Sequence, residues 1–197
     1  MSFSPQASAR AELQRATAAV HARLHRVPAF ATLAADRLDR DAYLGRLGRV
    51  YGFHDPLETA VAQAGPPGLQ PVQWRRAHLL RSAMAALSWS DAVNGELPRH
   101  PASGGSWSPA HAMGCLYVTE GSTLGGRQLA RQLDHALPVE GAGRSFLLAG
   151  AGRGHVRWHD FCAALDECGA DPAARAKLVA GAMETFHCFE AWFAQMI

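Results

Sequence analysis

The chain has few cysteines, and its charges of opposite sign nearly balance. No two of its four cysteines are spaced as C-x-x-C, the spacing on which zinc knuckles and thioredoxin-like sites depend. Both of these classes are therefore excluded. The 19 basic and 17 acidic residues leave a net charge of +2. Because a nucleic-acid-binding surface needs a clustered basic excess, the sequence predicts no nucleic-acid partner.

Long apolar runs are also missing. The N-terminal segment MSFSPQASARAELQRA lacks the apolar stretch that a secretory leader carries. No run elsewhere approaches the roughly 20 residues that a helix needs to cross a bilayer. The four cysteines are expected to be reduced residues that fill the core. Together these observations predict a cytoplasmic protein without a membrane anchor.

Helical patterns recur along the sequence, and strand patterns do not. Apolar residues make up 48% of the 197 residues, and at roughly 150 residues per domain this length suits one domain. We therefore expect a single all-α domain over residues 1–197, built as a helical bundle. The expected helices run from the Ser4-Pro5 cap to about 26, from 39 or 41 to about 61, and over 73–88, 108–133, 155–167 and 172–197.

Proline and glycine divide this helical pattern. Pro28 is expected to end the first helix. Pro56 is expected to kink the second helix, because its ring displaces one turn of the hydrogen-bond ladder. Segments 65–71 and 94–106 are predicted connections, and segment 141–154 is either a loop or a short buried helix.

The helix expected over 108–133 contains glycines, and each one costs about 1 kcal/mol relative to alanine. They are Gly114, Gly121, Gly125 and Gly126. Gly121 and Gly125 are four residues apart and share one face, which carries no side chains. Either another helix packs closely against the glycines, or a flat ligand lies on the exposed backbone. Ser122 and Thr123 favour a bend here, because their hydroxyls can bond back to the preceding turn.

Two histidine patterns could bind metal. His21 and His25 lie one turn apart in the first helix, either as satisfied or partly exposed core histidines or as ligands, and no carboxylate of that helix lies at the same turn to supply a third ligand. Glu184 and His187 have the E-x-x-H spacing of di-iron bundles. Those bundles use two such motifs, and the sequence holds one, so a di-iron site is weakly supported.

Two segments together resemble the heme oxygenases: TAAVH (17–21) and YVTEGSTLGG (117–126). The glycine segment is most similar to the bacterial, biliverdin-producing branch, which includes enzymes that accompany bacteriophytochromes. Weaker similarities follow in the same order at YGFHDPLE (51–58), WHDF (158–161) and TFHCFEAW (185–192). The resemblance therefore spans nearly the whole chain.

The resemblance implies a heme oxygenase-like fold, with heme between the first helix and the kinked, glycine-rich distal helix. His21 matches the proximal histidine that ligates heme iron, and imidazole is a common axial ligand. Gly121 and Gly125 match the distal glycines beside the oxygen-binding face. Ser122 stands where some members carry an aspartate that orders water. Gly121, Ser122 and Gly125 are therefore the expected catalytic residues.

Basic residues anchor the heme propionates in this family. Arg10, Tyr117 and Arg131 are the expected heme-binding partners besides His21, and the sequence does not choose between the two arginines. A ligating histidine normally donates its second ring N–H to a carboxylate, a carbonyl or water. One turn after His21 the chain has His25 instead of a carboxylate, so water or a backbone carbonyl is expected to fill that role.

The resemblance implies an enzyme that uses O2 to cleave heme to biliverdin, carbon monoxide and ferrous iron. The chain has no nucleotide-binding fingerprint, so electrons are expected from a ferredoxin or a flavin reductase. A bacteriophytochrome is a candidate recipient of the biliverdin. The alternative is a non-catalytic heme-binding or heme-sensing protein on the same scaffold. The intact Gly121 and Gly125 pair favours the enzyme, because a carrier does not need it.

Overall fold

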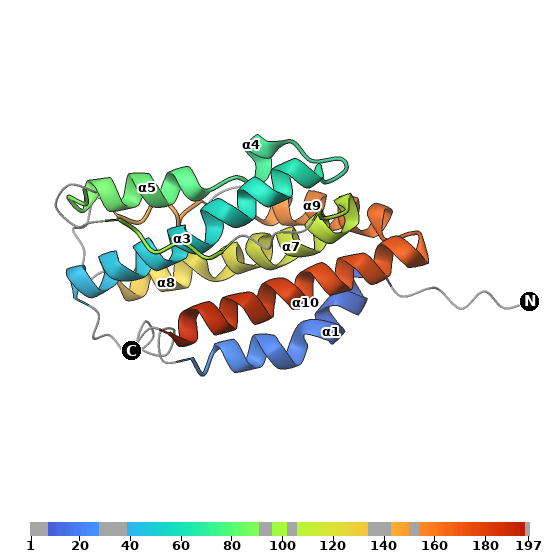
Figure 1. Ribbon diagram of the computed structural model, residues 1–197, viewed down its shortest axis with the longest axis horizontal. Coiled ribbons are helices and arrows are strands. Elements are labelled where there is room, and N and C mark those ends of the chain that lie inside the picture. The colour runs from blue at the N-terminus through green and yellow to red at the C-terminus, as the bar shows by residue number, and fades with distance from the viewer. Residues whose placement is uncertain are drawn as a thin grey trace, which may run out of the picture.

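The computed structural model describes residues 8–27, 39–90, 96–101, 106–133, 143–149 and 154–195, and within these ranges all regular structure is helical. In chain order the elements are α1 (Ala9–Leu24), α3 (Arg40–Ala64), α4 (Pro71–Trp74), α5 (Ala77–Ala86), α7 (Pro109–Ser122), the 3-10 turn η1 (Thr123–Gly125), α8 (Gly126–Gln132), α9 (Gly154–Cys168) and α10 (Pro172–Ala194). Figure 1 shows α3, α7 and α10 running along the bundle, with α1 beside α10. The predicted all-α bundle is confirmed.

Polar caps start the helices where the sequence predicted them. Ser108 accepts a hydrogen bond from the His111 amide at 3.2 Å, directly before Pro109 opens α7. Asp171 caps α10 in the same way. The Ser4-Pro5 start predicted for the first helix lies outside the described residues. In the described part of the chain, α1 begins after Ser8, whose hydroxyl accepts from the Ala11 amide.

Pro56 does not interrupt α3, which continues through it as one helix of 25 residues. A proline ring leaves the carbonyl four residues earlier without its helical donor. Here that carbonyl belongs to Gly52, and it accepts a hydrogen bond from the His100 amide at 2.9 Å. Segment 96–101 packs so closely at this point that a Cβ on Gly52 would clash with the Pro98 carbonyl. The neighbouring segment thus satisfies the carbonyl that Pro56 leaves free.

The single helix predicted over 73–88 is wrong, because the chain forms α4 and α5 with a break at Arg75 and Arg76. The buried carboxylate of Glu58 accepts hydrogen bonds from the backbone amides of Arg76 and Ala77. The N-terminal cap of α5 is therefore a side chain of α3, and Glu58 precedes Arg76 by 18 residues in the chain. In segment 141–154, the described residues 143–149 form turns rather than a helix.

The core is built around the close pairing of α7 with α10. A Cβ on Gly114 would clash with the carbonyl of Leu178, and one on Gly181 would clash with that of His111. Around this seam the side chains of α1, α7, α9 and α10 share one cluster that includes Leu13, Met113 and Leu165. Burying each such side chain contributes roughly 1.5–3 kcal/mol. The seam holds α7 firmly up to its last turn.

Two further observations bear on the predictions. All four cysteines are free, and Cys115 and Cys162 are buried, which fits the expected role as core residues. Burial raises the pKa of Cys115 to about 12, so its thiol stays protonated. Within the described ranges, no helix combines the length and the apolarity needed to cross a membrane.

Candidate functional site

The glycine-rich helix is broken where its sequence predicted a bend. α7 ends at Ser122, a single 3-10 turn covers Thr123–Gly125, and α8 continues from Gly126. The Ser122 hydroxyl donates to the Thr119 carbonyl at 2.7 Å, and the Thr123 hydroxyl donates to the Glu120 carbonyl at 2.7 Å. These are the predicted bonds to the preceding turn, and they favour the tighter 3-10 geometry.

The four glycines of this helix lie in two kinds of environment. A Cβ on Gly114 would clash with the Leu178 carbonyl, and one on Gly126 would clash with the Leu147 carbonyl. A Cβ on Gly125 would meet nothing within 4 Å, and one on Gly121 would touch only the tip of the Trp158 ring at 3.6 Å. Close packing therefore explains Gly114 and Gly126. Open backbone remains at Gly121 and Gly125.

Helix α1 approaches α7 one turn before this open backbone. The buried Thr17 hydrogen-bonds to the Tyr117 side chain. Burial raises the pKa of Tyr117, and the bond to Thr17 partly offsets that rise. Figure 1 shows that α1 and α7 begin at the same end of the bundle and run in the same direction. His21 and Gly121 follow Thr17 and Tyr117 by one helical turn each. They are therefore expected at the same level along the bundle.

His21 is an exposed residue, so it is not a fully buried core histidine. Its ring lies 4.8 Å from the ring of His25 and 6.0 Å from that of Phe186, edge-on to both. Partial burial, and then the charge of His25, lower the pKa of His21 below its usual value. The imidazole is therefore neutral near pH 7, which is the form that ligates metals.

Protein side chains alone do not build a metal site in the described part of the chain, where no three His, Cys, Asp or Glu residues cluster suitably. A metal held by His21 must therefore bring most of its own ligands, as iron in a porphyrin does. Glu184 of the E-x-x-H motif instead pairs with His111, whose Nε2 lies 3.3 Å from its carboxylate. His187 is exposed.

The expected anchoring residues do not all come together. The Tyr117 ring lies beside the Trp158 ring, tilted to it, with a centroid distance of 5.8 Å, and the Arg10 guanidinium lies 5.9 Å from the centroid of the same Trp158 ring. Arg131 is exposed on α8, beyond the helix break. Figure 1 places α8 at the opposite end of the bundle from the start of α1, where Arg10 lies. Arg10 and Tyr117 therefore form one group, and Arg131 stands apart.

Two features of the site were missed from the sequence. Trp158 of α9 covers the side of Gly121 and contacts both Tyr117 and Arg10. Glu120, directly before Gly121, is buried in an ion pair with Arg76. The sequence analysis noted the WHDF and VTEG segments, but helical periodicity could not show that residues of α7 and α9 meet the residue that precedes α5.

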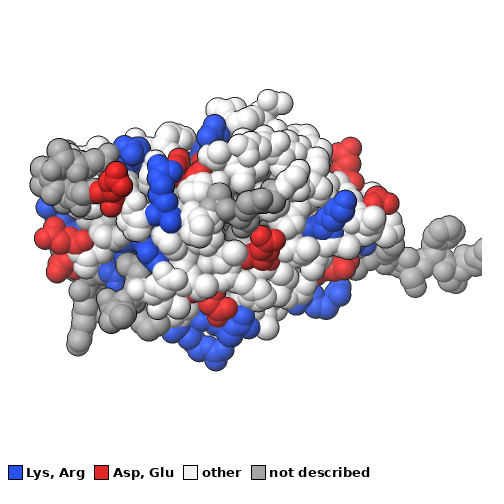
Figure 2. All heavy atoms as spheres, in the orientation of Figure 1, with Lys and Arg blue, Asp and Glu red and all other residues white. Residues whose placement is uncertain are grey.

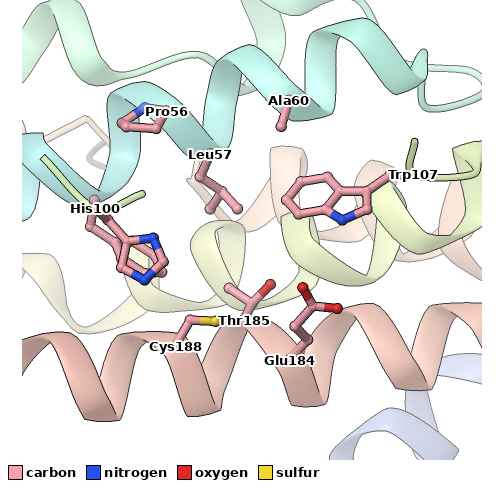
Figure 3. A pocket seen from close by; sticks show the side chains of 9 residues that line it. Pro56, Leu57, Ala60, His100, Trp107, Glu184, Thr185 and Cys188 are labelled. Atoms are coloured by element: carbon pink, nitrogen blue, oxygen red, sulfur yellow. The ribbon is translucent and has the colours of Figure 1, made fainter. Parts of the chain in front are cut away.

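A separate small pocket lies on another side of α10. Figure 3 shows α10 below and α3 above this pocket, with Trp107 and His100 between them. Its lining residues are Phe53, Pro56, Leu57, Ala60, His100, Trp107, Glu184, Thr185 and Cys188. None of the predicted heme-site residues lines it. The pocket is therefore distinct from the predicted heme site.

Comparisons with known proteins agree with this architecture. The family model described as heme oxygenase matches residues 7–195. The chain is similar in structure to the heme oxygenase from Leptospira interrogans, with a TM-score of 0.77, 16% identity and coverage of 96% of this chain and 100% of that one. It is also similar to heme oxygenase-1 from the cyanobacterium Synechocystis in complex with heme, with a TM-score of 0.74, 15% identity and coverage of 95% and 91%.

Among curated proteins, no sequence matches the chain significantly. At identities this low, the two structural matches establish the fold alone. The family match carries more, because it extends over nearly the whole sequence. The chain belongs to the heme oxygenase family, the oxidoreductases that bind heme and cleave it.

Proposed function

We propose that this chain cleaves heme to biliverdin, carbon monoxide and ferrous iron, using O2 and external electrons, between α1 and the break in the glycine helix. The observation that carries the proposal is the open backbone at Gly125. At Gly125, in the break of the glycine helix, no atom of the described residues comes within 4 Å of the position that a Cβ would take. A flat ligand that lies against the break would occupy this space.

The residues present fit a heme. His21 offers a neutral imidazole for the iron, and Gly121 and Gly125 offer a face of α7 and η1 that carries no side chains. Heme supplies the redox-active iron and is itself the substrate. The Ser122 proton is committed to the Thr119 carbonyl, so its oxygen is left to accept a hydrogen bond from water. In this proposal Ser122 holds water beside the glycines.

The propionates are proposed to lie toward Arg10 and Tyr117. Both residues are next to Gly121 through their shared contact with Trp158. Arginine suits carboxylates because its guanidinium can donate two parallel hydrogen bonds. Arg131, beyond the break, is the alternative anchor for the opposite orientation of the ring. The choice between these anchors would set which biliverdin isomer forms.

Electrons are proposed to come from a ferredoxin or a flavin reductase. Arg15, Arg23 and Arg26 are exposed on or just after α1. Figure 2 shows basic side chains along the edge where Figure 1 draws α1. Such a rim attracts an acidic electron donor. We further propose that the chain acts as one domain in the cytoplasm, whose reducing conditions suit four free cysteines, and that a bacteriophytochrome receives the biliverdin.

The test is a spectroscopic titration of the protein with hemin, followed by ascorbate in air with catalase present. The proposal expects a Soret band that then decays as a biliverdin spectrum grows. A Soret band that persists under ascorbate would identify a heme carrier or sensor instead. The absence of any Soret shift would mean that the chain has no heme site.

Two neighbouring histidines provide a matched pair of variants for the same assay. His21→Ala should abolish turnover without unfolding the chain, because the side chain is exposed. His25→Ala removes the adjacent ring and should still turn over heme. Biliverdin formation by His21→Ala at the parent rate, without added imidazole, would show that another residue ligates the iron.

A further inference from the structure

A buried group of charges lies directly before the break in the glycine helix. Glu120, in the last turn of α7, is 5% exposed, and Arg76, just before α5, is 3% exposed. A third charge, Arg157 of α9, approaches the second oxygen of Glu120 at 3.8 Å. Three segments far apart in the sequence therefore meet at the residue that precedes Gly121.

Arg76 holds both the side chain and the backbone of this turn. Its guanidinium donates to the Glu120 carboxylate and to the Thr119 carbonyl, the latter at 3.3 Å. The Thr119 carbonyl also accepts the Ser122 hydroxyl, and the Glu120 carbonyl accepts the Thr123 hydroxyl. Arg76 therefore bonds to Thr119 and Glu120, the two residues whose carbonyls also accept the hydroxyl bonds that favour the 3-10 turn η1.

Such a pair is costly to bury. Burial raises the pKa of Glu120 and lowers that of Arg76, because each charge loses its contact with water. A buried ion pair often stabilises a fold no more than apolar residues of the same size would. In some proteins the benefit of such a pair is a defined geometry. Here the pair lies at the turn that leads into the open glycines.

We propose that Glu120 is a positioning residue: held by Arg76 and Arg157, it fixes where α7 gives way to η1, and thereby sets the backbone of Gly121 and Gly125. This inference rests on the proposed function for its catalytic meaning. The effect of Glu120 on the backbone at the break does not require heme, so it can be measured in the protein without heme.

Glu58 provides a matched control. It is 4% exposed, almost the same as Glu120, and it also meets Arg76. Its partners, however, are the backbone amides of Arg76 and Ala77 at the start of α5, together with the His54 ring, whose Nδ1 lies 3.5 Å away. Glu58→Gln therefore removes an equally buried charge and leaves the bonds at the break in place.

The first experiment measures amide hydrogen exchange in the protein without heme. Glu120→Gln should speed exchange of the amides at 122–126 about 10-fold, the effect of losing roughly one charge-assisted hydrogen bond. Glu58→Gln should speed exchange at the start of α5 and leave 122–126 unchanged. Equal exchange at 122–126 in Glu120→Gln and in the parent would overturn the proposal.

The second experiment adds hemin and ascorbate. Glu120→Gln should slow turnover more than it weakens hemin binding, and it should broaden the mixture of biliverdin isomers. Glu58→Gln should keep the parent's turnover and product. A parent that never cleaves heme would refute the proposed function, whereas an active parent matched by Glu120→Gln in rate and product would refute the positioning role alone.

If Glu120→Gln does not fold, Arg157→Gln is the variant on which the same exchange measurement tests the proposal. Arg157 is partly exposed. Its guanidinium lies 3.8 Å from the second oxygen of Glu120 and also donates to the Gln73 carbonyl of α4, so the variant retains the bonds from Arg76 to Glu120. At 122–126 a smaller acceleration of exchange than in Glu120→Gln is expected, separate from any change beside Gln73. Exchange that matches the parent there would overturn the proposal.

Discussion

The four glycines of α7, η1 and α8 divide one continuous stretch of chain into closed and open positions. Gly114 and Gly126 face backbone carbonyls, of Leu178 and Leu147, which leave no room for a side chain. Gly125 faces open space, and Gly121 faces only an aromatic tip. All four cost the helix a similar amount, about 1 kcal/mol each. At the closed positions the missing side chain allows close packing against a backbone carbonyl. At the open positions no described backbone atom makes use of the missing side chain.

This difference separates the glycines that close packing explains from those that it does not explain. The closed glycines hold α7 to α10, and α8 to the turn at Leu147. The open glycines lie between them, at the break that the Ser122 and Thr123 hydroxyls stabilise. Close packing on both sides of the break therefore flanks a stretch of backbone that the described residues leave open. If heme binds there as proposed, these packed elements would hold it more accurately than loops would.

The largest expected effect comes from filling the open space. Gly125→Leu should leave the fold and heme binding intact but abolish ring cleavage, because the side chain enters the space beside the ligand. Thermal unfolding and the ascorbate assay check these two expectations. Gly45→Leu is the control, since Gly45 of α3 also faces nothing within 4 Å and lies outside the site. Equal biliverdin yields from both variants would place the distal face elsewhere.

The next effect comes from filling a closed position. Gly114→Ala puts a methyl group onto the Leu178 carbonyl, so α7 and α10 must separate. Overpacking of this kind costs about 3 kcal/mol of unfolding free energy. Gly125→Ala, in contrast, should change stability by less than about 1 kcal/mol, as an exposed glycine replacement does. Urea unfolding measures both, and similar losses in the two variants would remove the distinction between closed and open glycines.

The smallest effect is a difference in pH dependence between the start of α7 and its end. Burial lowers the pKa of His111, against the opposing effect of Glu184. The unfolded chain then binds the proton more readily, so the stability from His111 is present above pH 6.5 and is lost as pH falls. His111→Gln should flatten this acid loss in urea unfolding between pH 7.5 and 5.5. An unchanged slope would contradict the assignment.

At the other end of α7 the sign is reversed. Burial raises the pKa of Glu120, so the folded chain takes up its proton at higher pH than the unfolded chain does. The charged form of Glu120 therefore stabilises the fold less than its protonated form does, and this difference shrinks as pH falls toward 5. Glu120→Gln should remove that contribution, so stability should be lost more steeply on acidification in this variant than in the parent.

Local sequence signals predicted much of the fold. Ser108-Pro109 and Asp171-Pro172 mark helix starts because capping depends on neighbouring residues only. The bend after Gly121 was predictable for the same reason, since Ser122 and Thr123 bond within their own turn. The break between α4 and α5 was not predictable, because its cap is the Glu58 carboxylate of another helix.

The site was predictable only in part. The G-x-x-x-G spacing drew attention to Gly121 and Gly125 but left close packing and a bound ligand as alternatives, and nothing local distinguishes these glycines from Gly114. That distinction depends on which backbone carbonyl approaches each glycine from α10 or from the turn at Leu147. The Glu120 ion pair and the Trp158 contact likewise depend on tertiary packing. The two arginines expected as anchors proved to lie on α1 and α8, at opposite ends of the bundle.

The most direct test of the central claim is a crystal structure of the protein bound to hemin. The account predicts iron ligated by the His21 imidazole, with the other face of the porphyrin against the backbone of Gly121 and Gly125. Iron bound by a different residue, or heme seated in the pocket between α3 and α10, would contradict it.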